Sequence, residues 1–188
     1  MVNKRLFLAL PSGDEIMFRQ TLDELEKITS RDSINWISPG NLHLTIRFIG
    51  ETSENRIPAI INAMENAAKR VIPYGSRIAK IGLFGSSYQP RVIWAGWNDE
   101  GHTLALHEQL KSELQKAGFP ADRQNFVPHL TLGRIRHIAD KRFFSKQIAT
   151  MSEREFGNVF NNRLILFESI LKPSGPEYRE LHLSELKG

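Results

Sequence analysis

Apolar and polar positions in the first third of the chain follow two different periods, which predict two strand–helix units. An unbroken apolar run at 6–10 stops at Pro11, as expected of a buried strand, and the turn residues after it can start a helix that ends near Ser30. A second strand is predicted over 41–49, and it ends at Gly50. The helix predicted after it carries apolar residues at helical spacing: Ile57, Ile60, Ile61, Met64 and Ala68.

The rest of the chain combines one strongly periodic helix with several strand candidates. Residues 101–118 repeat Leu at helical spacing and end at a glycine, and a weaker basic helix is predicted over 141–150. No low-complexity tract or Gly/Ser linker divides the chain. Strands are predicted over 76–84, 91–97, 126–134, 155–160, 163–171 and 178–186, with loops at 85–90 and 172–176.

Composition is that of an ordinary globular protein and excludes several kinds of chemistry. The 188 residues suffice for one sizeable domain or two small fused lobes, and 40% of them are hydrophobic. A net charge of +4 and a pI near 9.5 are compatible with a polyanionic partner without requiring one. The chain has no cysteine, which excludes disulfides, thiolate nucleophiles, Fe–S clusters and Cys-ligated zinc.

Neither a signal peptide nor a membrane span is expected. The apolar run at 6–10 is shorter than the roughly 7–15 residues of a signal-peptide core. No stretch approaches the roughly 18 consecutive apolar residues of a membrane-spanning helix. Together with the absence of cysteine, this predicts a cytoplasmic protein that does not enter a membrane.

One short motif occurs twice. Residues 42–46 read LHLTI and residues 128–132 read PHLTL, and each copy follows a turn that contains proline. His129 lies 86 residues after His43, almost half the length of the chain. Two related lobes that each contribute one strand would explain this repeat.

Each copy of the motif can place two reactive side chains on one side of a strand. Side chains alternate along a strand, so His43 and Thr45 share a face about 6.6 Å apart, and His129 and Thr131 do the same. Two imidazoles of opposite protonation state can act as general acid and general base, and hydroxyls can donate to phosphoryl oxygens. Side by side, the two strands would hold the groups for phosphoryl transfer without a metal.

The chain resembles the 2H phosphoesterases, specifically the RNA 2′,3′-cyclic phosphodiesterases, also called 2′-5′ RNA ligases. The resemblance covers nearly the whole sequence. It is carried by NLHLTIRFIG at 41–50 and FVPHLTLGR at 126–134, supported by RLF at 5–7, PRVIWAG at 90–96 and LKPSGPEY at 171–178.

The resemblance implies a fold and an activity. The fold would be α+β, a single bilobal domain over 1–188 with pseudo-two-fold symmetry, two antiparallel sheets with outer helices and a central cleft. The activity would be hydrolysis of RNA 2′,3′-cyclic phosphate ends to a 2′-phosphate, with reversible 2′-5′ ligation as a further reaction and without a cofactor or required metal. By analogy, His43 would protonate the departing O3′ and His129 would activate water. The two motifs are nearly identical, so the residues alone do not distinguish these roles.

Two arginines near the motifs are candidate phosphate ligands. Arg47 lies four positions after His43, which in a regular strand puts it on the same face, although a solvated strand end would explain it equally well. Arg134 lies five positions after His129 and would face away unless a bulge at Gly133 restores the phase. An arginine there is usual in the family, which favours a phosphate-binding role. Arg136 and His137 fit solvated loop residues better.

Other histidines and aromatic residues fit supporting roles. His102 and His107 lack the spacing of a zinc pair, and His182 begins a His-x-Ser pattern outside the motif context. Phe84 and Tyr88, beside a Gly-Ser-Ser loop, are candidates for stacking on a nucleobase. Core or cleft-wall positions are predicted for the tryptophans, which are Trp36, Trp94 and Trp97.

Two alternative functions fit the same residues. A 2H enzyme that acts on small cyclic-phosphate or 2′-5′ oligonucleotide metabolites would need the same four motif side chains. In a basic RNA-binding module, the histidines would be structural and the motif side chains would not take part in catalysis. The leading hypothesis is a monomer whose partners are RNA ends that bear a cyclic phosphate.

Overall fold

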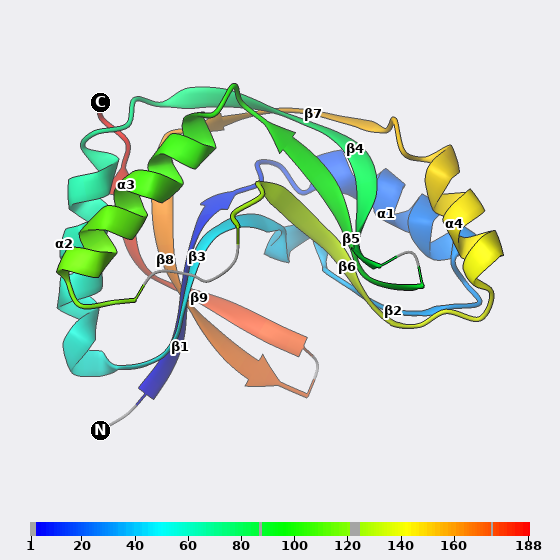
Figure 1. Cartoon of the computed structure of the whole chain (residues 1–188), viewed down its shortest axis with the longest axis horizontal. Helices are drawn as coiled ribbons and strands as arrows, with labels where there is room; N and C mark the ends of the chain where they lie inside the picture. Colours follow the sequence, from blue (N-terminus) through cyan, green and yellow to red (C-terminus); the bar gives the residue numbers. More distant parts are fainter. Residues whose placement is uncertain (1–2, 87, 121–124, 174) are drawn as a thin grey trace.

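The computed structural model describes residues 3–86, 88–120, 125–173 and 175–188 and contains two antiparallel sheets (Figure 1). In the first sheet the strand order is β3 (His43–Ser53), β1 (Asn3–Pro11), β8 (Arg163–Lys172) and β9 (Gly175–Glu185). The N-terminal and C-terminal strands therefore belong to the same sheet. The second sheet has the order β2 (Ser33–Trp36), β6 (His129–His137), β5 (Gln89–Asn98), β4 (Tyr74–Ser86) and β7 (Glu155–Asn161).

Helices lie at both ends of the molecule (Figure 1). The helices α2 (Ile57–Ala68) and α3 (His102–Lys116) pack on each other and against the first sheet. Near the second sheet lie α1 (Ile16–Ile28) and α4 (Lys141–Thr150), and Phe18 of α1 contacts Phe156 of β7. Two short 3-10 turns, η1 (Pro39–Asn41) and η2 (Glu54–Arg56), precede β3 and α2.

Both motif strands bury their apolar side chains on one side and carry the histidine on the other. Leu44 of β3 and Leu130 of β6 are fully buried, and apolar residues on either side of them belong to the same core. His43 and His129 are only partly buried. We call the side of each sheet that carries His43 and Thr45, or His129 and Thr131, the histidine face. The alternation predicted for the motif strands is confirmed over these residues.

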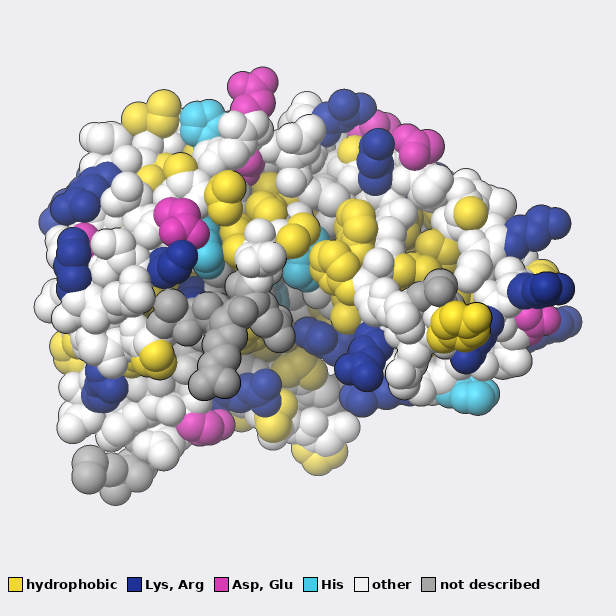
Figure 2. Space-filling model, viewed as in Figure 1, with side chains coloured by type: hydrophobic (Ala, Val, Ile, Leu, Met, Phe, Trp, Pro, Cys, Tyr) yellow, Lys and Arg dark blue, Asp and Glu magenta, His cyan; other side chains and the backbone are white. Residues whose placement is uncertain are grey.

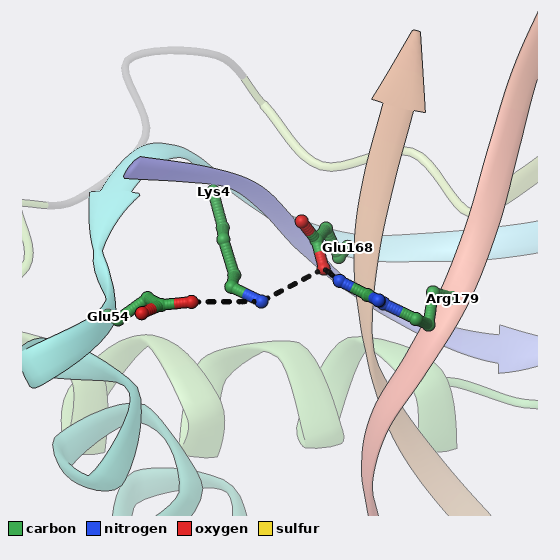
Figure 3. Close-up of polar contacts among 4 residues, drawn as sticks. All are labelled: Lys4, Glu54, Glu168 and Arg179. Carbon is green, nitrogen blue, oxygen red and sulfur yellow. Dashed lines mark hydrogen bonds and ion pairs between the residues drawn. The ribbon is translucent and has the colours of Figure 1, made fainter. Parts of the chain in front are cut away.

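A charge cluster on the opposite side of the first sheet ties three of its elements together (Figure 3). Glu168 of β8 accepts hydrogen bonds from Lys4 of β1 and from Arg179 of β9, and Lys4 also pairs with Glu54 of η2 at 3.1 Å. Burial raises the pKa of Glu168, but the hydrogen bonds from Arg179 and Lys4 outweigh it and hold that pKa below 4.5. These two cations thus serve the fold and lie away from the histidine face.

The fold class expected from the sequence is confirmed, with local differences: β3 runs on past Gly50 to Ser53, β4 and β5 extend into the expected loop at 85–90, and β6 covers 129–137 instead of 126–134. β2 was not predicted, because four residues with Ser and Asn among them give no clear alternation. β8 and β9 extend into the expected loop at 172–176, so that they form a hairpin whose residue 174 is outside the described chain. No helix in the described ranges is long and apolar enough to cross a membrane.

Candidate active site

The two histidines begin their strands and are oriented by the same hydrogen bond. Nδ1 of His43 lies 2.8 Å from the carbonyl oxygen of Asn41, and Nδ1 of His129 lies 2.7 Å from that of Val127. A carbonyl oxygen only accepts, so each Nδ1 carries the hydrogen. In both rings Nε2 is therefore the nitrogen left to exchange a proton with a ligand.

The pairing of β3 with β1 shows where the expectation for Arg47 was wrong. Thr45 pairs with Ala9 and Arg47 pairs with Leu8, so Ile46 is an extra residue that forms a bulge. Because paired residues share a face, Arg47 lies on the core side with Leu8 and not beside His43. Its side chain is 6% exposed. Phe48 takes the place on the histidine face and contacts Phe7.

The same irregularity in β6 brings Arg134 onto the histidine face. Thr131 pairs with Trp94 of β5 and Gly133 pairs with Ile93, which makes Leu132 the extra residue. Arg134 then pairs with Val92 and recovers the phase of His129 and Thr131. The condition stated for Arg134, a bulge at Gly133, is met by a bulge one residue earlier.

Glycine is needed at position 133 because β2 lies very close to β6 there. A Cβ built there would lie 2.8 Å from Trp36 and 2.9 Å from Ile34, both on β2. A larger residue would push β2 away from β6, so glycine at this position allows the close approach of the two strands.

Aromatic rings enclose both imidazoles. The ring of His43 lies 4.8 Å from that of Phe7 and 5.1 Å from that of Tyr178, while the ring of His129 lies edge to face with Phe84 at 4.7 Å. Phe7 and Tyr178 lie in the supporting segments at 5–7 and 171–178, but nothing in the sequence places them beside a histidine, since that depends on the strand register. Tyr88, the second stacking candidate, is 80% exposed at the β4–β5 hairpin.

The pKa values of both histidines are lowered by the same two causes. Burial is the larger cause for His43 and for His129, and the positive charge of Arg134 adds to it in each case. The backbone hydrogen bonds raise these pKa values in part. Arg134 also acts on the pKa of Tyr178, which burial raises above 10.0. One guanidinium thus acts on side chains of both sheets, whose strands β3 and β6 are in contact.

The motif threonines have free hydroxyls. Thr45 and Thr131 are partly exposed on the histidine face, and within the described ranges neither hydroxyl is hydrogen-bonded to another protein group. Both can therefore donate to an anionic oxygen. Figure 2 shows histidine, apolar and Lys or Arg side chains near the middle of one face, with most Asp and Glu side chains towards its edges.

The remaining histidines lie elsewhere. His182 of β9 faces Glu65 of α2 at 3.4 Å, and His107 is buried against Phe126. His102 stacks on Tyr74 at the rim of a separate pocket of about 480 Å³. Among the residues that the structure describes, no group of three or more His, Cys, Asp or Glu side chains could hold a metal ion.

Comparison with known proteins identifies the family. The sequence model of the family described as LigT like Phosphoesterase matches residues 14–94 and again 98–178. The chain belongs to the LigT-like phosphoesterases. The first match contains His43 and the second contains His129, so this LigT-like phosphoesterase carries the family pattern once in each half, as the repeated motif predicted.

Individual relatives agree with this family. The LigT-like chain is 30% identical to the RNA 2′,3′-cyclic phosphodiesterase of Thermotoga maritima over 98% of its own length and 96% of the relative's. It is 29% identical to the protein of the same name from Methanocaldococcus jannaschii, covering 93% and 96% of the two chains. The resemblance to the 2H phosphoesterases is confirmed.

Solved structures share the fold of this LigT-like phosphoesterase. A crystal structure of a protein from Thermus thermophilus superposes with a TM-score of 0.79 at 28% identity and covers 98% of each chain. The structure of E. coli LigT complexed with 3′-AMP gives a TM-score of 0.81 over 100% of both chains. At 22% identity, that second likeness concerns the fold alone.

Proposed function

We propose that this LigT-like phosphoesterase hydrolyses RNA 2′,3′-cyclic phosphate ends to a 2′-phosphate. The observation that carries the proposal is the pair of equivalent histidines, each with Nδ1 fixed by a carbonyl and both affected by the charge of Arg134. The names of the relatives support the substrate. Both histidines come from one chain, so a monomer with one bilobal domain is sufficient for the reaction.

The proposed step transfers two protons. Water attacks phosphorus while Nε2 of His129 takes a proton from it, and the P–O3′ bond breaks while Nε2 of His43 gives a proton to O3′. Arg134 and the hydroxyls of Thr45 and Thr131 donate to the phosphoryl oxygens, whose charge grows in the transition state. These roles follow the family analogy. Ligation would be the same step with the 5′-hydroxyl of a second RNA in place of water.

The end group of the product tests this proposal. An oligonucleotide with a 2′,3′-cyclic phosphate is incubated with the protein, and ³¹P NMR identifies the phosphate at the new end. We expect the 2′-phosphate alone, because a phosphate held by fixed donors keeps one ester oxygen in line with the attacking water. A 3′-phosphate or a mixture would mean that the assigned leaving oxygen is wrong.

Two parallel measurements decide between the alternatives. A cyclic mononucleotide that is turned over faster than the oligonucleotide would favour a small-metabolite phosphodiesterase. RNA binding without turnover of either substrate would favour a binding module.

The pH dependence is expected to be displaced to the acid side. One histidine must be neutral and the other protonated, so kcat/KM is largest between the two apparent pKa values of the coupled pair in the free protein. Burial and Arg134 lower both pKa values from 6.5, which places the maximum below pH 6.5 and makes kcat/KM fall as the pH rises from there. A pH series of initial rates measures this, and a maximum above pH 7.5 would contradict it.

A further inference from the structure

Arg47 extends from the strand of one histidine towards the segment that leads to the other. It lies four residues after His43 on β3, and its guanidinium is buried on the core side of the first sheet. There Nη2 donates a hydrogen bond to the carbonyl oxygen of Pro120, just after α3. A buried guanidinium needs such partners.

A second anchor lies at Phe126, three residues before β6 begins. The imidazole of His107, on α3, stacks on the ring of Phe126 with centroids 4.2 Å apart and an interplanar angle of 4°. His107 is 6% exposed. Its pKa is lowered mainly by burial, with Arg47 and Lys111 adding to the effect and Glu108 opposing it. A neutral ring in this position can stack without the cost of burying a charge.

The contact between His107 and Phe126 lies next to the carbonyl group that orients His129. Phe126 directly precedes Val127, whose carbonyl oxygen fixes Nδ1 of His129 at 2.7 Å. A shift of Phe126 would therefore move Val127 and turn the imidazole of His129. The corresponding carbonyl for His43, that of Asn41, belongs to η1, where the 3-10 turn itself fixes the main chain.

We propose that Arg47 and His107 are positioning residues for the Nε2 of His129: Arg47 holds the chain just after α3, and His107 of α3 holds Phe126. Arg47 thereby links the strand of His43, through α3 and the ring of His107, to the orientation of His129. The consequence for catalysis rests on the proposed phosphodiesterase function. The positioning itself does not, because it concerns the free protein.

Substitution of Arg47 separates positioning from phosphate binding. In Arg47→Met, a side chain of similar length that cannot donate, we expect kcat on the cyclic-phosphate oligonucleotide to fall about tenfold, since small displacements of a reacting group cost this much or more. KM should stay within about twofold, because Arg47 is buried on the core side and not on the histidine face. Arg47→Lys keeps a charged donor and is expected to recover most of the lost kcat.

The stacking anchor has its own pair of variants. His107→Ala removes the ring under Phe126 and is expected to lower kcat about tenfold, whereas His107→Phe keeps a flat ring and should restore most of that loss. Arg70→Met is the matched control, since Arg70 also contacts α3, at Gln109 and Glu113, but lies on its exposed side. It should leave kcat within about twofold.

A readout without substrate keeps the inference independent of the proposed function. The ¹H–¹⁵N NMR signal of the His129 Nδ1–H group is expected to shift or broaden in Arg47→Met and His107→Ala, and to remain in place in Arg70→Met. If the wild-type protein turns over no cyclic phosphate, the proposed function fails while this signal still tests positioning.

Three results would overturn the inference. A rise in KM of about tenfold with unchanged kcat in Arg47→Met would make Arg47 a substrate ligand. An unchanged His129 signal in folded Arg47→Met and His107→Ala would leave both residues with a role in the fold only. If Arg47→Met does not fold, the same signal in Arg47→Gln and in His107→Ala decides, and no change in either would likewise refute positioning.

Discussion

His43→Ala and His129→Ala are each expected to lower kcat on a 2′,3′-cyclic phosphate oligonucleotide by about 10³-fold. Each variant removes one of the two proposed proton-transfer groups, and general acid or base catalysis contributes about 10²–10⁴ in rate. Initial rates under saturating substrate measure the effect. In the proposed mechanism both groups act in the same step, so the double variant should lose little more than either single variant.

Stability should hardly change in these variants. Both side chains are partly exposed and contribute one hydrogen bond to a carbonyl, so the free energy of unfolding is expected to stay within about 1 kcal/mol. His182→Ala is the matched control, since it removes a histidine that lies on β9 against Glu65. A wild-type rate in either His43→Ala or His129→Ala would exclude the two-histidine mechanism.

Arg134→Gln is expected to lower kcat/KM by about 10²-fold and to raise the pKa values of both His43 and His129. The loss in rate follows from the proposed role of Arg134 as a charged donor to the phosphoryl oxygens. The rise in the pKa values follows from the sign of the charge, since Arg134 lowers both in the native protein. NMR titration of the histidine side chains and the position of the kcat/KM maximum report this change, and the maximum should move to higher pH.

The control for this variant carries the same change of charge on the same strand. Arg136 is exposed on β6, and it is not among the charges that shift the pKa of either motif histidine. Arg136→Gln should leave the rate and the pH maximum nearly unchanged. Equal effects of the two variants would mean that Arg134 acts through the general charge of the protein and not through the site.

The sequence was sufficient to predict which strand face carries the motif histidines and threonines, but not which face carries Arg47 and Arg134. The reason is local geometry. Alternation along a strand is a property of two or three residues, so it placed Thr45 with His43 and Thr131 with His129 correctly. A bulge depends on the partner strand and leaves no clear mark in the strand that contains it. This is why Arg47 was expected on the wrong face, and why the phase of Arg134 could only be stated as conditional on a bulge.

The aromatic surroundings of the site could not be predicted for a related reason. Phe7 stands in the first strand and Tyr178 in the last, and they meet at His43 only because the strands that carry them belong to the same sheet as β3. Apolar periodicity predicts which residues are buried but not which strands pair. The helix over 141–150 was predicted from weak periodicity, and the side chain of Asp140, which caps it, gives a local reason for its start.

Because its two halves are covalently linked, this chain can carry different residues at the equivalent positions that follow the two bulges. Five residues after its histidine, each half presents one side chain on the histidine face, Phe48 in one half and Arg134 in the other. Two identical half-length subunits about an exact dyad would have to carry the same residue at both places, either two cations or none. Covalent linkage of the halves lets a single cation, Arg134, act on the pKa values of both imidazoles while a phenyl ring occupies the equivalent place in the other half, so that a nearly symmetric scaffold acquires a direction.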